Sequence, residues 1–267
     1  MTKLGDIRPP PDLDWQHWVD SWDRMQERYL VERNQRFETM VRLIRETQDS
    51  LEAVLDLGCG TGSLMSSVLE AFPEARVSGI DFDPAILWLA EARLARFGDR
   101  SRVLLADMRR ASWTRDVPSG LDAVVSATAL HWLAEPQLAS LYPQVAALMR
   151  PGAIFLNADH VGSDCPGIQR VWERGRDFAL SRQGGARSDH WDDFWGAYSR
   201  ALGLDLDPIR RRVAGDWEDG VEEGLPLAWH FDRLRESGFG SVDCFWRTDC
   251  DAIYGGVRSS QLLRNGG

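Results

Sequence analysis

Several features that would place a protein in a membrane or an oxidising compartment are missing from this sequence. No run of residues is apolar enough to cross a bilayer, and the N-terminal residues lack the apolar core of a signal peptide. The four cysteines, at positions 59, 165, 244 and 250, form no CxxC pair, which argues against a zinc site or a disulfide framework. We therefore expect a cytoplasmic protein with reduced thiols and no bound metal.

Basic residues are also in short supply. The chain has 31 Lys and Arg against 41 Asp and Glu, for a net charge of −10. A nucleic-acid surface needs an excess of positive charge, and the same imbalance disfavours adhesion to an anionic membrane. Neither a nucleic acid nor a membrane is expected as a partner. Tyrosine is rare, with four residues against twelve tryptophans, but the composition is otherwise that of a globular protein.

The 267 residues suffice for one large domain or for a domain with a modest cap. Helical spacing of apolar residues predicts two helices before residue 48. Short apolar runs then alternate with helical segments, which predicts a parallel sheet covered on both faces. The expected strands lie at 53–57, 77–80, 103–106, 123–126, 153–156, 242–247 and 252–257.

Residues 160–215 break this alternation with helical stretches around 171–180 and 191–202. We read them as a helical cap inserted into the sheet domain. The expected organisation is an N-terminal helical segment at 1–48, a core at 49–159 and 216–267, and the cap at 160–215. The expected fold is therefore α/β, with a doubly wound, mostly parallel seven-stranded sheet.

The strongest local motif is VLDLGCGTG at 54–62, which follows a predicted strand and opens a helix. Its glycines allow a tight turn and a close approach of the backbone to a ligand. A dinucleotide-binding turn would carry a third glycine where this chain has Ser63. Asp56, two residues before Gly58, would repel a pyrophosphate but attract an ammonium group. An NAD-dependent oxidoreductase is therefore disfavoured.

Two further carboxylates end the next two predicted strands. Asp81 can accept both hydroxyl hydrogens of a ribose. Asp107 can accept from an exocyclic amine, while a neighbouring backbone N–H at Met108 can donate to an adenine ring nitrogen. In open α/β sheets, ligands bind outside the carboxyl ends of the strands, where these residues meet.

These motifs resemble those of class I S-adenosylmethionine-dependent methyltransferases. The resemblance covers residues 51–158 and about the last thirty residues. It rests on VLDLGCGTG, GIDFDP (79–84), ADM (106–108), DAVVSATALHWL (122–133), LMRPGA (148–153) and ESGFGSVDCFWR (236–247).

The resemblance implies a site for S-adenosylmethionine, and for its product S-adenosylhomocysteine, along the sheet edge. Asp56, Gly58 and Gly60 would surround the methionine part, Asp81 the ribose, and Asp107 with Met108 the adenine. Ser126 and Ala127 would pass beneath the sulfonium. The remaining residues assigned to this site are Cys59, as a small filler in the glycine loop, and Phe82.

On the acceptor side, His131 and Trp132 follow the fourth predicted strand. The segment ALHWL resembles that of methyltransferases acting on small carboxylic acids, of the trans-aconitate type, and also occurs in relatives that methylate other groups. His131 could donate to a carboxylate or accept a proton, and Trp132 could wall the acceptor. His160, next to Asp159, is a second candidate for a catalytic residue.

Tryptophans concentrate in the segments that cover the acceptor in this family. Seven of the twelve tryptophans lie there: Trp15, Trp18, Trp22, Trp172, Trp191, Trp195 and Trp217. Aromatic walls suit a planar or largely apolar small molecule, and they could also pack against a cationic one. Trp18 and Trp22 are the candidates for contact with the substrate.

The sequence thus predicts methyl transfer from S-adenosylmethionine to a small organic acceptor, with oxygen of a carboxylate or hydroxyl as the first choice and a specialised metabolite as the hypothesis. Two alternatives stay open: methylation of nitrogen or carbon in a small molecule, and a non-catalytic S-adenosylmethionine-binding protein. A monomer and a homodimer are both compatible with the sequence.

Overall fold

The computed structural model describes residues 12–182, 190–214 and 223–260. Seven strands form one sheet in the order β3-β2-β1-β4-β5-β7-β6. Strands β1 to β5 are parallel to their neighbours, and β7 runs antiparallel to both β5 and β6. The strands are β1 (Ala53–Leu57), β2 (Arg76–Asp81), β3 (Ser101–Leu105), β4 (Leu121–Ala127), β5 (Met149–His160), β6 (Phe239–Thr248) and β7 (Asp251–Arg258).

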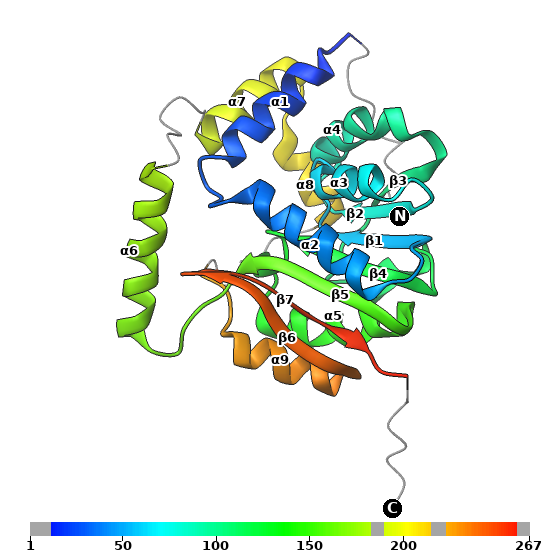
Figure 1. Ribbon diagram of the computed structural model, residues 1–267. Helices are drawn as coiled ribbons and strands as arrows, with labels where there is room; N and C mark the ends of the chain where they lie inside the picture. The colour runs from blue at the N-terminus through cyan, green and yellow to red at the C-terminus, as the bar shows by residue number, and fades with distance from the viewer. Residues whose placement is uncertain (1–11, 183–189, 215–222, 261–267) are drawn as a thin grey trace, which may run out of the picture.

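Helices cover both faces of this sheet (Figure 1). The α-helices are α1 (Trp15–Gln26), α2 (Arg33–Thr47), α3 (Ser63–Ala71), α4 (Pro84–Leu94), α5 (Glu135–Leu148), α6 (Pro166–Arg182), α7 (Trp191–Leu202), α8 (Leu206–Ala214) and α9 (Leu227–Glu236). The 3-10 helices are η2 (Ala95–Arg100), η3 (Ala111–Arg115) and η4 (Leu130–Trp132). The doubly wound fold expected from the alternation of strands and helices is therefore confirmed.

Two apolar clusters fill the layers between sheet and helices. On one face, α2, α3 and α4 contribute residues such as Ile44, Val68 and Leu87 to a cluster with β1, β2 and β4. On the other face, α5 and α9 pack with residues such as Tyr142 and Leu234 against β5 and β7. Because strands buried on both faces lack a polar side, they read as continuous apolar runs rather than as alternating patterns.

A third cluster joins α1, α4, α7 and α8 at one end of the molecule. Trp22 and Met25 of α1 pack with Phe194 and Tyr198 of α7 against Trp88 of α4. Figure 1 shows α1 and α7 side by side, whereas α6 lies at the edge of the molecule, where Trp172 packs under Arg247 of β6. The N-terminal helix and part of the cap therefore share one apolar core, although about 170 residues separate them in the sequence.

The element boundaries differ from the predicted ones in a few places. Strand β5 extends over Met149–His160 rather than 153–156, and β3 begins at Ser101 rather than at 103. Helix α8 was not predicted, because three arginines interrupt its apolar pattern. Trp217 lies outside the described residues.

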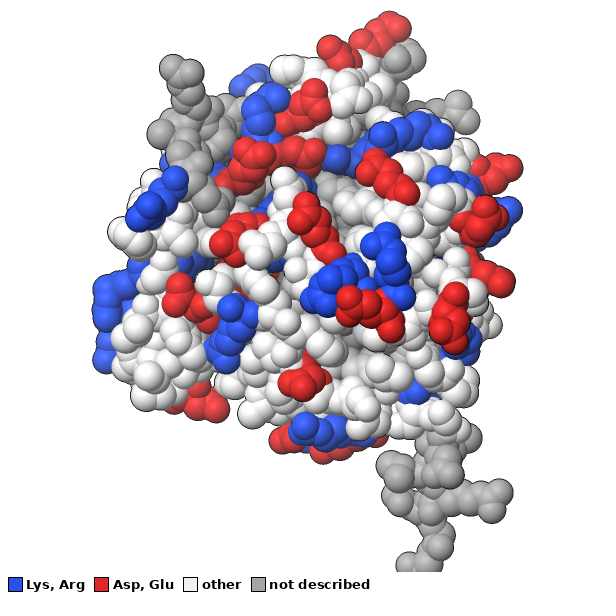
Figure 2. Space-filling model, viewed as in Figure 1, with Lys and Arg blue, Asp and Glu red and all other residues white. Residues whose placement is uncertain are grey.

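Among the residues that the structure describes, both membrane-spanning helices and clusters of metal ligands are absent. None of the helices placed there is long and apolar enough to cross a membrane. In the same ranges, no group of three or more His, Cys, Asp or Glu side chains is arranged to hold a metal ion. Figure 2 shows acidic and basic side chains interspersed over the face in view rather than gathered by sign.

Candidate active site

The glycine loop between β1 and α3 is held in left-handed backbone conformations. Gly58 has φ +65°, and a Cβ there would lie 2.4 Å from the Ala129 Cβ. Gly60 has φ +53°, but a Cβ there would meet no atom within 4 Å. The N–H of Cys59 donates to the Ile80 carbonyl at 2.9 Å, which ties the loop to β2. The space beside Gly60 is thus open to a ligand, whereas Gly58 is required by packing.

Asp56 at the carboxyl end of β1 is 1% exposed. Its Oδ2 atom has no hydrogen-bond partner among the residues that the structure describes. Burial, and then the charge of Asp81, raise the pKa of this carboxyl well above its usual range. A buried carboxylate oxygen without a donor is costly unless a ligand supplies one. Asp56 therefore fits the ammonium group of a bound amino-acid moiety.

Asp81 ends β2 and reaches back to the glycine loop. Its Oδ2 accepts from the Gly60 N–H and its Oδ1 from the Asp83 N–H, both at 3.0 Å. Burial raises the pKa of Asp81 to about 6, with the nearby Asp83 charge adding to the rise and the backbone donors opposing it. A carboxylate has about four acceptor positions, so its oxygens can also accept from ribose hydroxyls.

Asp107, expected to receive the adenine amine, is already engaged. Arg109 contacts both of its oxygens, at 2.9 and 3.0 Å, and Arg110 approaches Oδ2 at 3.2 Å. The Arg109 backbone N–H donates to Oδ1 as well, at 3.0 Å. An adenine amine would therefore share or displace one of these contacts. Met108 extends toward the glycine loop, with its Cε 3.7 Å from the position of a Cβ on Gly58.

The other residues assigned to the cofactor lie along the same edge. Ser126 donates from Oγ to the Leu57 carbonyl at 2.7 Å, which joins the ends of β4 and β1. Ala127 ends β4 and Phe82 follows β2, and both are half-buried. Burial raises the pKa of the Cys59 thiol well above its usual range, which suits a filler rather than a nucleophile.

His131 and Asp159 form a buried pair at the ends of β4 and β5. Nδ1 of His131 lies 2.6 Å from Oδ1 of Asp159, whose other oxygen accepts from the N–H groups of Leu130 and His131. Burial raises the pKa of Asp159, but the charge and hydrogen bond of His131 outweigh it and hold the pKa well below its usual range. Asp159 is therefore ionised, so Nδ1 of His131 is the donor and Nε2 of the neutral ring carries the lone pair.

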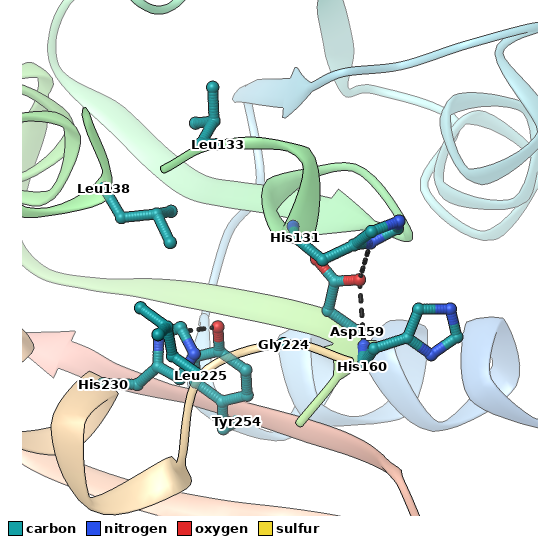
Figure 3. Close-up of a pocket in the computed structure, with 9 residues that line it drawn as sticks. All are labelled: His131, Leu133, Leu138, Asp159, His160, Gly224, Leu225, His230 and Tyr254. Carbon is teal, nitrogen blue, oxygen red and sulfur yellow. Dashed lines mark hydrogen bonds and ion pairs between the residues drawn. The ribbon is translucent and has the colours of Figure 1, made fainter. Parts of the chain in front are cut away.

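His160 belongs to a second arrangement of the same kind. Its Nδ1 lies 2.7 Å from Oδ1 of Asp251, and Oδ2 of Asp251 lies 2.8 Å from Nη2 of Arg36. The His131 and His160 rings are 4.8 Å apart between centroids. Figure 3 shows both rings on the same side of Asp159, away from Leu133 and Leu138. The two histidines called candidate catalytic residues are thus brought together.

Behind this pair lies a cavity of about 10 Å³, room for about one water molecule. On its wall, Nδ1 of His230 contacts the Tyr142 and Tyr254 hydroxyls at 2.6 and 3.1 Å. The Tyr254 hydroxyl accepts from Asn157 at 2.8 Å. Burial lowers the pKa of His230 to about 4, so this imidazole is neutral at pH 7. The cavity is too small for an acceptor.

The three tryptophans assigned to the substrate occupy different environments. Trp18 packs against Phe194 and Tyr198, and Trp22 against Phe194, edge to face. Trp132 is 41% exposed, and its ring is tilted by 40° against the His131 ring at a centroid distance of 4.8 Å. The contacts of Trp18 and Trp22 therefore join α1 to the cap, while Trp132 presents a face next to His131.

The cap also contacts the cofactor side of the sheet. Nε of Arg210 in α8 lies 2.8 Å from Oδ2 of Asp83, and its guanidinium lies 4.0 Å from the Trp195 ring. Asp83 caps α4, as its position before Pro84 suggests, by accepting from the Ala85 N–H. This contact connects the cap to the segment that begins two residues earlier with Asp81.

Sequence reasoning missed Arg36, Asp251 and His230. Arg36 lies in an amphipathic helix, where a charged residue is normally solvated, and Asp251 follows a β-turn without a recognisable motif. Arg36 and Asp251 obtain their partners only where α2, β5 and β7 meet, and His230 obtains its partners only where α9 meets α5 and β7. No local signal in the sequence distinguishes them.

Comparison with known proteins places this arrangement in a class. Residues 54–152 match the family model described as a methyltransferase domain. This match identifies residues 54–152 as a methyltransferase domain, and the sheet has the fold of S-adenosylmethionine-dependent methyltransferases.

Among curated relatives, the chain is 35% identical over 113 residues to a trans-aconitate 2-methyltransferase of Methylobacterium radiotolerans, covering 42% of this chain and 40% of that protein. The chain therefore spans about two fifths of the length of the curated relatives it matches. The apo form of the S-adenosylmethionine-dependent methyltransferase SibL shares the fold, with 18% identity, a TM-score of 0.54, and coverage of 97% of this chain and 63% of that one. Human N-acetylserotonin methyltransferase aligns with 14% identity, a TM-score of 0.51, and coverage of 95% and 61%.

Proposed function

We propose that this chain transfers a methyl group from S-adenosylmethionine to oxygen in a small organic acceptor that carries a carboxylate or a hydroxyl. The observation that carries the proposal is the His131–Asp159 pair, 2.6 Å between heteroatoms, at the sheet edge that also holds Asp56 and Asp81. A histidine oriented by a buried carboxylate can hold or move a proton at Nε2. This chemistry suits an oxygen acceptor, since the histidine can take a proton from a hydroxyl or donate to a carboxylate.

Bound S-adenosylmethionine supplies a methyl group that its positive sulfur has already activated. The protein then has to orient the acceptor and exclude water, and orientation alone can contribute about 7–11 kcal/mol. Asp56 would hold the ammonium group and Asp81 the ribose. Neither residue takes part in the transfer, so their loss is expected to weaken cofactor binding rather than to change the pH dependence of turnover.

His131 can serve either kind of acceptor. With a hydroxyl, the lone pair of Nε2 takes the proton, and ionised Asp159 stabilises the imidazolium that results. With a carboxylate, protonated Nε2 donates to an acceptor oxygen and no base is needed. The relatives named for trans-aconitate methylation support a carboxylate as the first choice. The proposal that the acceptor is a specialised metabolite rests on the aromatic residues of α1 and the cap.

The proposed division of the chain assigns coverage of the acceptor to residues 1–48 and to the helical insertion at 160–215. Its support is the apolar cluster that joins α1 to α7. A small molecule fits such a covered site better than a large folded protein does. We propose Trp132, whose ring lies 4.8 Å from the His131 ring, as the aromatic wall nearest the reacting oxygen.

The test combines isotope-labelled S-adenosylmethionine with trans-aconitate, a phenol and a primary amine, and compares the parent with His131→Gln. We expect label in an oxygen acceptor, a loss of about 10²–10⁴-fold in rate for His131→Gln, and unchanged binding of S-adenosylhomocysteine. His17→Gln, at an exposed histidine, is the matched control.

Two results would contradict the proposal of oxygen methylation and favour one of the alternatives. Tight binding of S-adenosylhomocysteine without transfer to any acceptor would favour a non-catalytic S-adenosylmethionine-binding protein. Label only in the amine, or on carbon, would favour nitrogen or carbon methylation.

A further inference from the structure

Arg210, in helix α8 of the cap, lies between an acid and an aromatic ring that belong to different parts of the fold. Its Nε donates to Oδ2 of Asp83 at 2.8 Å, and its guanidinium carbon lies 4.0 Å from the centroid of the Trp195 ring. The side chain of Arg210 is 26% exposed and that of Asp83 is 8% exposed. Water screens a pair enclosed to this degree less than it screens a surface pair. The contact therefore joins the cap to the core by charge as well as by packing.

Asp83 is at the centre of the turn between β2 and α4. Its Oδ1 accepts from the Ala85 N–H at 2.9 Å, which caps α4, and its own backbone N–H donates to Oδ1 of Asp81 at 3.0 Å. Burial raises the pKa of Asp83, and the charge and hydrogen bond of Arg210 oppose this rise. One oxygen of Asp83 is thus engaged by α4 and the other by Arg210, while the backbone of the same residue holds the carboxylate assigned to the ribose.

The aromatic neighbour of Arg210 belongs to the cover proposed for the acceptor. The ring of Trp195 in α7 packs edge to face against Trp22 of α1 and against Phe194, with centroids 5.8 and 5.4 Å apart. Trp22 and Phe194 are both members of the apolar cluster that joins α1 to α7. Arg210 therefore lies where that cluster meets the turn that carries Asp81.

We propose that Arg210 is a positioning residue for the cofactor: by holding the Asp83 carboxylate, it keeps the turn between β2 and α4, and with it Asp81, in the conformation that binds the ribose. This assignment rests on the proposed function, in which Asp81 accepts from the ribose hydroxyls. It adds a residue of the cap to those that set the affinity for S-adenosylmethionine. Because coupling between two binding events is reciprocal, bound cofactor in turn favours docking of α8 on the core.

The other charged groups near Arg210 do not make this contact. Asp207, on the same helix, lies 4.0 Å from Nη1 of Arg210 and is 76% exposed, and such an exposed pair contributes little. Arg211, the next residue of α8, is exposed. Arg211→Met is therefore a matched control for Arg210→Met, because it removes the same charge from the same helix and leaves the pair with Asp83 in place.

The first experiment measures the affinity for S-adenosylhomocysteine by calorimetry, without an acceptor. We expect Arg210→Met to weaken binding by about tenfold and Arg211→Met to bind like the parent protein. Arg210→Lys should recover most of the loss, because its ammonium group can approach the Asp83 oxygen that Nε now contacts. Parent-like affinity in Arg210→Met, an equal loss in Arg211→Met, or no recovery in Arg210→Lys would each overturn the proposal.

A double-variant comparison tests whether Arg210 acts through Asp83. Asp83→Asn keeps an oxygen that can cap α4 but removes the charge that Arg210 holds. We expect Asp83→Asn to weaken S-adenosylhomocysteine, and the double variant to bind no more weakly than the weaker single variant. Losses that multiply would mean that the two residues act independently, against the proposal. If Arg210→Met fails to fold, unchanged affinity in Asp83→Asn would still overturn it.

Hydrogen exchange gives a readout that a purely structural ion pair would not change. S-adenosylhomocysteine should slow amide exchange in α8 in the parent protein and in Arg211→Met, and this slowing should be absent in Arg210→Met. Exchange in α8 of the parent protein that does not respond to the ligand would contradict the proposal. Absence of methyl transfer to any acceptor would refute the proposed function without changing these affinities, so the two failures can be told apart.

Discussion

The carboxylate of Asp81 accepts a hydrogen bond from the Gly60 N–H at 3.0 Å, so the residue assigned to the ribose also fixes the loop assigned to the methionine part. One buried side chain thereby connects two segments of the cofactor site. Its pKa of about 6 means that this connection titrates in an experimentally accessible range.

Binding of S-adenosylhomocysteine should depend on the ionisation of Asp81. Only the ionised carboxylate accepts from both ribose hydroxyls, so affinity should fall by about tenfold per pH unit below pH 6. Asp81→Asn should weaken binding by about 100-fold at pH 8, because charged hydrogen bonds contribute about 1.5–3 kcal/mol each. Calorimetric titration at pH 5 and pH 8 measures both effects. Asp116→Asn, at an exposed acid, is the control, and unchanged affinity in Asp81→Asn would refute the ribose assignment.

Asp81 should also lower the stability of the ligand-free protein at neutral pH. Its folded pKa of about 6 lies above the unfolded value of about 3.9. The folded state is therefore favoured while the carboxyl is protonated, and about 3 kcal/mol of this advantage is lost as the pH rises through 6. Chemical unfolding of the parent and Asp81→Asn should show a difference that grows between pH 4 and pH 7. A constant difference across this range would be inconsistent with a raised pKa.

Alanine at Gly60 should separate backbone strain from ligand contact. Gly60 and Gly203 both have positive φ, +53° and +65°, with nothing within 4 Å of an added Cβ. Each substitution should cost about 1–2 kcal/mol of stability because a side chain is strained in this region. Only Gly60→Ala should also weaken S-adenosylhomocysteine, since its Cβ enters the open space of the loop. Equal affinities for the two variants would place the ligand elsewhere.

His230 should make folding less favourable in mild acid. Its folded pKa of about 4 lies below the unfolded value of about 6.5. The neutral imidazole contributes its full stability above pH 6.5, and about 3 kcal/mol is lost as the pH falls toward 4. His230→Gln removes this titration. Denaturant unfolding at pH 7.5 and pH 4.5 should therefore show a larger drop in the parent than in the variant, and similar drops would indicate that His230 is protonated inside the fold.

Trp22 and Trp132 should respond differently to alanine substitution. Trp22 is buried in the cluster of α1 and α7, so Trp22→Ala should cost about 3–5 kcal/mol of unfolding free energy. Trp132 is exposed, so Trp132→Ala should change stability by less than about 1 kcal/mol but raise the KM for the acceptor. Thermal unfolding and steady-state kinetics give the two readouts. An unchanged KM in Trp132→Ala would remove this residue from the acceptor wall.

Much of the fold could be predicted because its signals are local. The apolar runs at 53–57 and 77–80, the glycine loop between them and Asp81 at a strand end all lie within about thirty consecutive residues. The right-handed connection of parallel strands then brings these strand ends to one edge. The same logic put His131 and His160 near that edge, because both follow strands of the same sheet.

The contacts of each site residue, in contrast, could not be predicted from the sequence. Asp107 was expected to be available to adenine, but Arg109 and Arg110 occupy it. Trp18 and Trp22 were assigned to the substrate, but their contacts in the structure are with α7. Periodicity says that a residue faces inward, and it does not say which side chain it will meet there.

The sequence by itself determined the order of strands and helices, the glycine loop and the acids at the strand ends, because each depends on spacing along the chain. Tertiary structure alone decided that Arg36, Asp251 and His160 would share one buried cluster, although Arg36 and Asp251 are 215 residues apart. The physical reason is that a buried charge takes its properties from whatever lies within a few ångströms, and packing of distant segments sets those neighbours.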